Sequence, residues 1–65
     1  MQTIGKRVQK IRLNKGLSQY QLAKLSKVPR GTLIRIEQDK VEPRISTLEK
    51  IAKGLGVNVF DFLSK

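Results

Sequence analysis

Two short helical segments, separated by the dipeptide Val28-Pro29, occupy the centre of this 65-residue sequence. Ser18 and Gln21 form the capping-box pattern that begins a helix. That helix must be short, because the residue before a proline avoids the helical region of backbone conformation. Pro29 itself has the φ angle of a first helical turn, so a second helix is expected to begin there. The pattern predicts helices over about 18–26 and 29–38, joined by a tight turn.

A further helix is expected on the N-terminal side of this pair. Ile4, Val8 and Ile11 recur at the spacing of four and three residues that places them on one helical face. Gly16 follows and is suited to the left-handed conformation that ends many helices. The segment predicts a helix over 3–15.

Two more helices are expected after residue 44. Ser46 and Glu49 form a second capping-box pattern, followed by an apolar stripe and a terminating glycine, which predicts a helix over 45–55. Asn58 is suited to cap a short last helix over 58–64.

These segments predict an all-α fold, a compact five-helix bundle that forms one domain over residues 1–65. The chain has neither Cys nor His, so helix packing must supply its stability, with dimerisation as a further source. Gly31, Arg35 and Gln38 are expected to face away from the core, with Ile34 beside them. The expected inward-facing positions of the second, third and fourth helices are Leu22, Ala23 and Leu25, then Leu33 and Ile36, then Ile45, Leu48, Ile51, Ala52 and Leu55.

The net charge of +9 is unevenly distributed along the chain. Residues 1–36 carry nine basic side chains and no acidic one, whereas residues 37–65 carry five of each sign. A positive surplus of this size attracts polyanions such as nucleic acid. A solvated basic face and a membrane surface are the competing interpretations of such a pattern. The basic residues are Lys6, Arg7, Lys10, Arg12, Lys15, Lys24, Lys27, Arg30 and Arg35.

Several short motifs stand in register across nearly the whole chain. They are Gly16-Leu17-Ser18-Gln19 followed by Leu22-Ala23, then Val28, Leu33, Ile36-Glu37, Pro43, Leu48-Glu49-Lys50-Ile51-Ala52-Lys53 and Leu55-Gly56-Val57. In this combination the sequence resembles the phage-repressor and Cro-like helix-turn-helix domains, the XRE family with the lambda-repressor-like fold. The resemblance implies that the segment 18–26 crosses the DNA backbone and that the segment 29–38 lies in the major groove.

The resemblance also implies which residues read bases. Arg30, Gly31, Ile34 and Arg35 match the base-reading positions of the family. Arg35 suits the O6 and N7 atoms of guanine, and Ile34 suits a thymine methyl group. For both residues an ordinary surface position is the alternative.

Phosphate contacts are expected around this helix. Ser18 and Gln19 match the residues with which relatives hold a phosphate at a helix start, although capping alone also accounts for Ser18. Flanking residues expected to contact phosphates are Lys27, Thr32, Lys40 and Arg44.

Arg12 and Glu37 match a structural ion pair of the family. Four positions depart from the family pattern. Lys27 stands where many relatives have glycine, so a left-handed backbone there would cost about 1 kcal/mol or more. Pro29 replaces the usual Ser or Thr cap, and Gly31, like Gly54, is expected to weaken its helix by about 1 kcal/mol relative to Ala.

The predicted function is sequence-specific binding of a double-stranded DNA operator by a cytoplasmic transcriptional regulator, in particular a repressor. A homodimer through the C-terminal helices is expected on DNA. No enzyme activity, cofactor, metal or membrane partner is expected, because the sequence lacks His, Cys, a phosphate-cradling glycine motif and an apolar run of about 18 residues. The alternative is an antitoxin or other protein-interaction module of the same fold, anchored by Phe60, Phe62 and Leu63.

Overall fold

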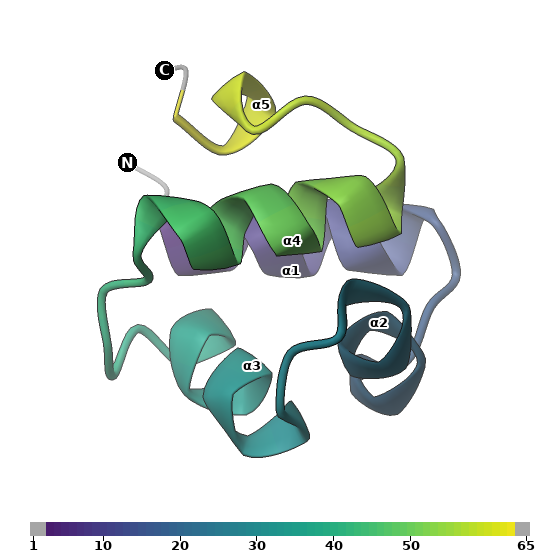
Figure 1. Ribbon diagram of the computed structural model, residues 1–65, viewed down its shortest axis with the longest axis horizontal. Coiled ribbons are helices and arrows are strands. Elements are labelled where there is room, and N and C mark those ends of the chain that lie inside the picture. The colour runs from purple at the N-terminus through teal and green to yellow at the C-terminus, as the bar shows by residue number, and fades with distance from the viewer. Residues whose placement is uncertain (1–2, 64–65) are drawn as a thin grey trace.

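The computed structural model describes residues 3–63, which form five helices and no strand (Figure 1). The helices are α1 (Ile4–Asn14), α2 (Gln19–Ser26), α3 (Arg30–Glu37), α4 (Ile45–Leu55) and α5 (Phe60–Leu63). The expected all-α fold and its five helices are confirmed. The expected end of the last helix at residue 64 lies outside the described residues. Within residues 3–63 no helix has the length and apolar character needed to cross a membrane.

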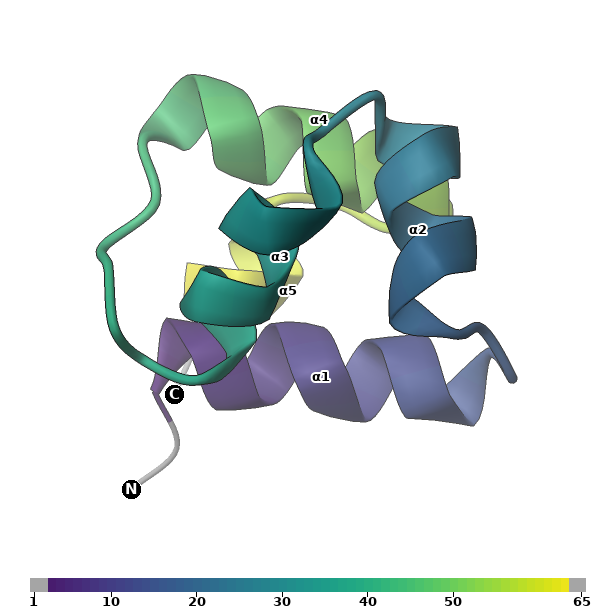
Figure 2. The ribbon, with the colours of Figure 1, turned by 90° about the horizontal axis from the view of Figure 1, so that it is seen from below.

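The helices lie in layers around one core. Helices α2 and α3 lie on one side of α1 and α4, and α5 lies on the opposite side (Figures 1 and 2). Helix α2 packs mainly on α4, α3 packs on α1 and α2, and α5 packs on α1. The layer of α2 and α3 therefore has an outer face that no other helix covers.

Each of the four long helices contributes at least one side chain to the apolar core, and α5 contributes Phe62. Two expected core residues are instead exposed: Leu25 is 58% exposed and Ile45 is 57% exposed. The buried face of α2 is made by Leu22, Ala23 and Ser26, and Leu25 lies about 100° around the helix from Ser26. Ile45 begins α4, three residues before the first buried position of that helix.

The capping box expected at the start of α2 is present. The Ser18 hydroxyl accepts a hydrogen bond from the Gln21 amide, and the Gln21 side chain accepts one from the Ser18 amide. The second expected capping box is wrong. Helix α4 begins after Arg44, which makes no side-chain cap, and Ser46 already lies within the first turn. An N-cap residue needs a non-helical backbone, so Ser46 cannot serve as one.

Helices α1 to α4 end in the same way. In each case a residue with positive φ follows the helix, and the amide after it bonds back to a carbonyl in the last turn. Gly16 and Gly56 hold two of these positions, as expected. The other two are held by Lys27, at φ 57°, and Asp39, at φ 62°.

Two glycines are needed for helix packing. A Cβ atom at Gly5 would collide with the Ile36 carbonyl oxygen, and one at Gly54 would collide with Ser26 Oγ and lie 3.1 Å from the Ser26 amide nitrogen. Gly54 therefore lets α4 approach α2 closely, a role that its cost in helix propensity did not reveal. At Gly31, by contrast, an added Cβ would meet nothing within 4 Å.

Candidate nucleic-acid interface

Helix α3 is anchored by one face and leaves the other uncovered. Leu33 and Ile36 are buried in the core. Arg30, Gly31 and Arg35 are exposed, and Ile34 and Thr32 are half-buried. The face expected to read bases is thus accessible along the length of a helix that the core holds in place.

A buried ion pair connects α1 to the end of α3. Arg12 Nε lies 2.7 Å from Glu37 Oε2, and Arg12 Nη2 donates to Glu37 Oε1 over 3.0 Å. Both side chains are nearly inaccessible, at 8% and 1% exposure. Arg12 Nη1 also donates to the Leu17 carbonyl over 2.8 Å. The pair that the family resemblance implied therefore ties α1 to the end of α3 and to the segment before α2.

Gln19 belongs to the same network. Its side-chain Nε2 donates to Glu37 Oε1 over 3.1 Å, and the side chain is half-buried. The first residue of α2 is thereby fixed against the last residue of α3. This bond uses one amide hydrogen of Gln19 and leaves its second hydrogen and its carbonyl oxygen for another partner.

The turn between α2 and α3 contains a left-handed residue that is not glycine. Lys27 adopts the left-handed backbone, and its side chain is exposed. Pro29 is the residue before α3, with φ −55° and ψ 138°, and it provides no side-chain cap. The first amides of α3 therefore have no capping side chain and face solvent or a ligand.

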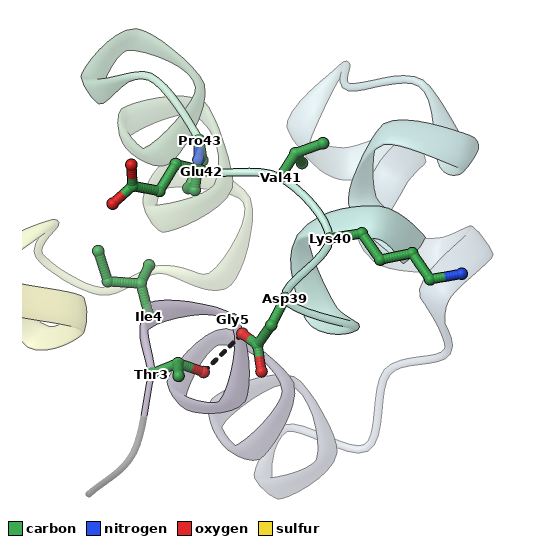
Figure 3. Close-up of a pocket in the computed structure, with 8 residues that line it drawn as sticks. All are labelled: Thr3, Ile4, Gly5, Asp39, Lys40, Val41, Glu42 and Pro43. Carbon is green, nitrogen blue, oxygen red and sulfur yellow. Dashed lines mark hydrogen bonds between the residues drawn. The ribbon is translucent and has the colours of Figure 1, made fainter.

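The loop after α3 is held against the start of α1. Thr3 Oγ1 donates to Asp39 Oδ1 over 2.6 Å (Figure 3). Thr3 also caps α1 by accepting from the Lys6 amide. Residues 3–5 and 39–43 line a groove of about 450 Å³ between these segments. The Lys40 side chain extends away from this groove (Figure 3), and both Lys40 and Arg44 are exposed.

Tyr20 is a candidate residue that sequence reasoning missed. It is 56% exposed, and two cations lie over its ring: Lys24 Nζ at 5.7 Å and the Arg30 guanidinium carbon at 6.0 Å from the centroid. Lys24 follows Tyr20 by one helical turn, so that contact was visible in the spacing. The contact with Arg30 depends on how α2 and α3 pack.

The C-terminal aromatic residues divide between core and surface. Phe62 is 1% exposed and fills the core, whereas Phe60 is 68% exposed and Leu63 is 42% exposed. Of the three residues considered as a partner anchor, only Phe60 and Leu63 remain accessible. No group of three or more acidic side chains within residues 3–63 is arranged to hold a metal ion.

Comparison with known proteins places these features in a family. A family model described as helix-turn-helix matches residues 8–62. The HTH-type transcriptional regulator PuuR of Escherichia coli (strain K12) is 46% identical over 61 residues, which cover 94% of this chain and 33% of that protein. The immunity repressor protein of Bacillus phage phi105 is 42% identical over 57 residues, which cover 88% of this chain and 40% of that protein. The chain thus spans well under half the length of these two relatives.

Solved structures agree with this assignment. The restriction-modification controller protein C.AhdI from Aeromonas hydrophila superimposes with a TM-score of 0.88 at 29% identity, covering 91% of this chain and 89% of that one. The wild-type controller protein C.Esp1396I gives a TM-score of 0.84 at 37% identity, covering 92% of this chain and 78% of that one.

Proposed function

The chain belongs to the helix-turn-helix family, and on that premise we propose that it binds double-stranded DNA sequence-specifically as a transcriptional regulator that represses its target. The observation that carries the proposal is the exposed face of α3, which the core and the Arg12–Glu37 pair hold rigidly beside the start of α2. A rigid reading element loses little conformational entropy on binding. The acid-free positive charge of residues 1–36 supplies the attraction to the duplex.

Base reading is assigned to the outward residues of α3. Arg35 is exposed and carries the bidentate donor pair that guanine accepts, and half-buried Ile34 offers methyl groups to thymine. Gly31 lies on the same face, and nothing in the fold requires a glycine there. Its lack of a side chain is explained if the α3 backbone approaches the bases closely.

Contacts with the DNA phosphate backbone are assigned to residues that precede, lie within and follow α3. Gln19, held by Glu37, and the Ser18 cap lie at the start of α2, where exposed amides favour a phosphate. Lys27 lies in the turn before α3, and half-buried Thr32 lies within α3. Lys40 and Arg44 follow α3 on the loop that the Thr3–Asp39 bond positions.

Assembly on DNA is part of the proposal. One short reading helix covers few base pairs, so we assign the protein a symmetric dimer on two half-sites about 34 Å apart. Exposed Phe60 and Leu63 of α5 provide an apolar surface for contact with the second copy. The cytoplasm is the proposed location, and no enzymatic activity is assigned, in keeping with the regulators that the chain resembles.

Selection of bound duplexes from a random pool tests the proposal, followed by titration of two variants. Arg35→Ala is expected to cost about 1–3 kcal/mol on the selected sequence and to relax the preference at one base position. Lys40→Ala removes an exposed cation from the loop after α3. It should weaken binding to all sequences alike. Failure to enrich any sequence would refute specific recognition, and a sequence-blind loss for Arg35→Ala would remove it from the reading face.

Dimerisation is tested by sedimentation with duplexes that hold one or two half-sites. Phe60→Ser should abolish the cooperative binding of two copies to the longer duplex and leave binding to one half-site unchanged. Cooperativity that is independent of half-site spacing, or unaffected by Phe60→Ser, would contradict this interface.

Exposed Phe60 also favours a second candidate function, a module whose main partner is another protein. The salt dependence of binding to random duplex separates the two. A DNA-binding protein loses affinity steeply as salt rises because counterions are released from the phosphates, whereas a protein adaptor has no such dependence on duplex.

A further inference from the structure

Tyr20, Lys24 and Arg30 form a compact group at the outer edge of α2 and α3, called here the tyrosine cluster. The Lys24 ammonium and the Arg30 guanidinium lie 5.7 Å and 6.0 Å from the centroid of the same ring. Two positive groups are thus brought together around one side chain that is itself 56% exposed. Helix α2 supplies the ring and the ammonium, and α3 supplies the guanidinium from its first residue.

Within residues 3–63, no acidic side chain forms a salt bridge with Lys24 or Arg30, because the salt bridge found there is Arg12–Glu37. The face of an aromatic ring attracts cations, so Tyr20 partly offsets the repulsion between its two neighbours. The ring carries no net charge, so the cluster as a whole remains an attractive position for an anion.

The cluster also changes what Arg30 is able to reach. Sequence resemblance groups Arg30 with the base-reading residues of α3. Its guanidinium, however, lies over a ring of α2, which is the helix expected to cross the DNA backbone. A guanidinium held beside α2 is placed near the helix that the family resemblance expects to cross the phosphate backbone.

We propose that Tyr20, Lys24 and Arg30 form a binding site for a backbone phosphate of duplex DNA, with Tyr20 as the residue that holds Arg30 there. This inference rests on the proposed function, because it takes the protein to be a DNA-binding protein. It moves Arg30 from base reading to backbone binding. Lys24 and Arg30 bind the phosphate oxygens, and Tyr20 acts as a positioning residue through its ring.

The expected effects follow from the ring's role. An exposed cation–π contact changes an equilibrium by about two- to fivefold. Tyr20→Leu, which removes the ring, should therefore weaken binding to all duplexes by about that factor. Tyr20→Phe keeps the ring and should bind nearly as the wild type does. In an Arg30→Gln background, Tyr20→Leu should have much less effect, because the group that it positions is already absent.

The experiment measures dissociation constants by fluorescence anisotropy for the whole chain, using a selected duplex and a scrambled duplex of equal length over a range of salt. Arg30→Gln should weaken both duplexes equally and reduce the salt dependence by about one phosphate contact. Leu25→Ala is the matched control, since Leu25 is exposed on the same helix and lies outside the cluster. Circular dichroism verifies that each variant is folded.

Four results would overturn the inference. An Arg30→Gln variant with a relaxed preference at one base position would show that Arg30 reads a base. Additive losses for Tyr20→Leu and Arg30→Gln would show that the ring does not act through Arg30. A wild type that binds DNA and a Tyr20→Leu variant with unchanged affinity would refute this inference alone, whereas a wild type that binds no duplex would refute the proposed function as well.

Discussion

Replacing Arg12 with Met should destabilise the protein more than any exposed substitution. Arg12 donates to both carboxylate oxygens of Glu37 and to the Leu17 carbonyl. Met fills most of the same volume but donates no hydrogen bond. Glu37, at 1% exposure, would keep only the Gln19 amide as a partner for its charge.

The expected loss is about 3–5 kcal/mol, the cost of leaving one charge of a buried pair without its partner. A domain of this length has a total unfolding free energy of roughly 3–10 kcal/mol, so the loss is a large share of it. For a small domain each kcal/mol lowers the melting temperature by about 4–8 °C. The variant should therefore melt at least about 10 °C below the wild type.

Urea denaturation followed by circular dichroism measures this loss. The double variant Arg12→Met, Glu37→Leu should recover most of the lost stability, because it removes the stranded charge together with its partner. Arg35→Met is the matched control on an exposed arginine and should stay within about 0.5 kcal/mol of the wild type. A loss below about 1 kcal/mol for Arg12→Met, or a double variant no more stable than the single one, would refute the reasoning.

Three further predictions concern the backbone and the caps, and thermal or urea unfolding measures each. Gly54→Ala should lower stability by about 1–3 kcal/mol because its Cβ would collide with Ser26. Gly31→Ala, at an open position, should raise stability by about 0.5–1 kcal/mol. A stability change of the same sign for both variants would contradict the packing argument. Lys27→Gly should stabilise by about 1 kcal/mol by relieving the left-handed backbone, and a loss would show that the lysine side chain matters to the fold. Ser18→Ala should cost about 1 kcal/mol through loss of the capping box, and an unchanged midpoint would show that solvent replaces the cap.

Local sequence determined most of the helix boundaries. The pattern of Ser18 and Gln21 specified the start of α2, and Gly16 and Gly56 specified two helix ends, because caps depend only on side chains and backbone within a few residues. Val28-Pro29 separated α2 from α3 for the same reason. Where local signals competed, prediction was weaker: Ser46 resembled a cap, yet α4 begins before it. The left-handed backbone of Asp39 was not predicted, because aspartate favours that conformation much less than glycine does.

The positions that depend on contacts between helices were decided only by tertiary structure. Leu25 is apolar and lies near the core positions of α2, but Ser26 takes the place facing α4 because Gly54 lets that helix approach so closely. The contact between Arg30 and the ring of Tyr20 joins side chains of two helices, and no spacing along the chain reports it. Helix propensity and capping act over one or two turns, whereas burial and side-chain pairing depend on how separate helices are oriented in space.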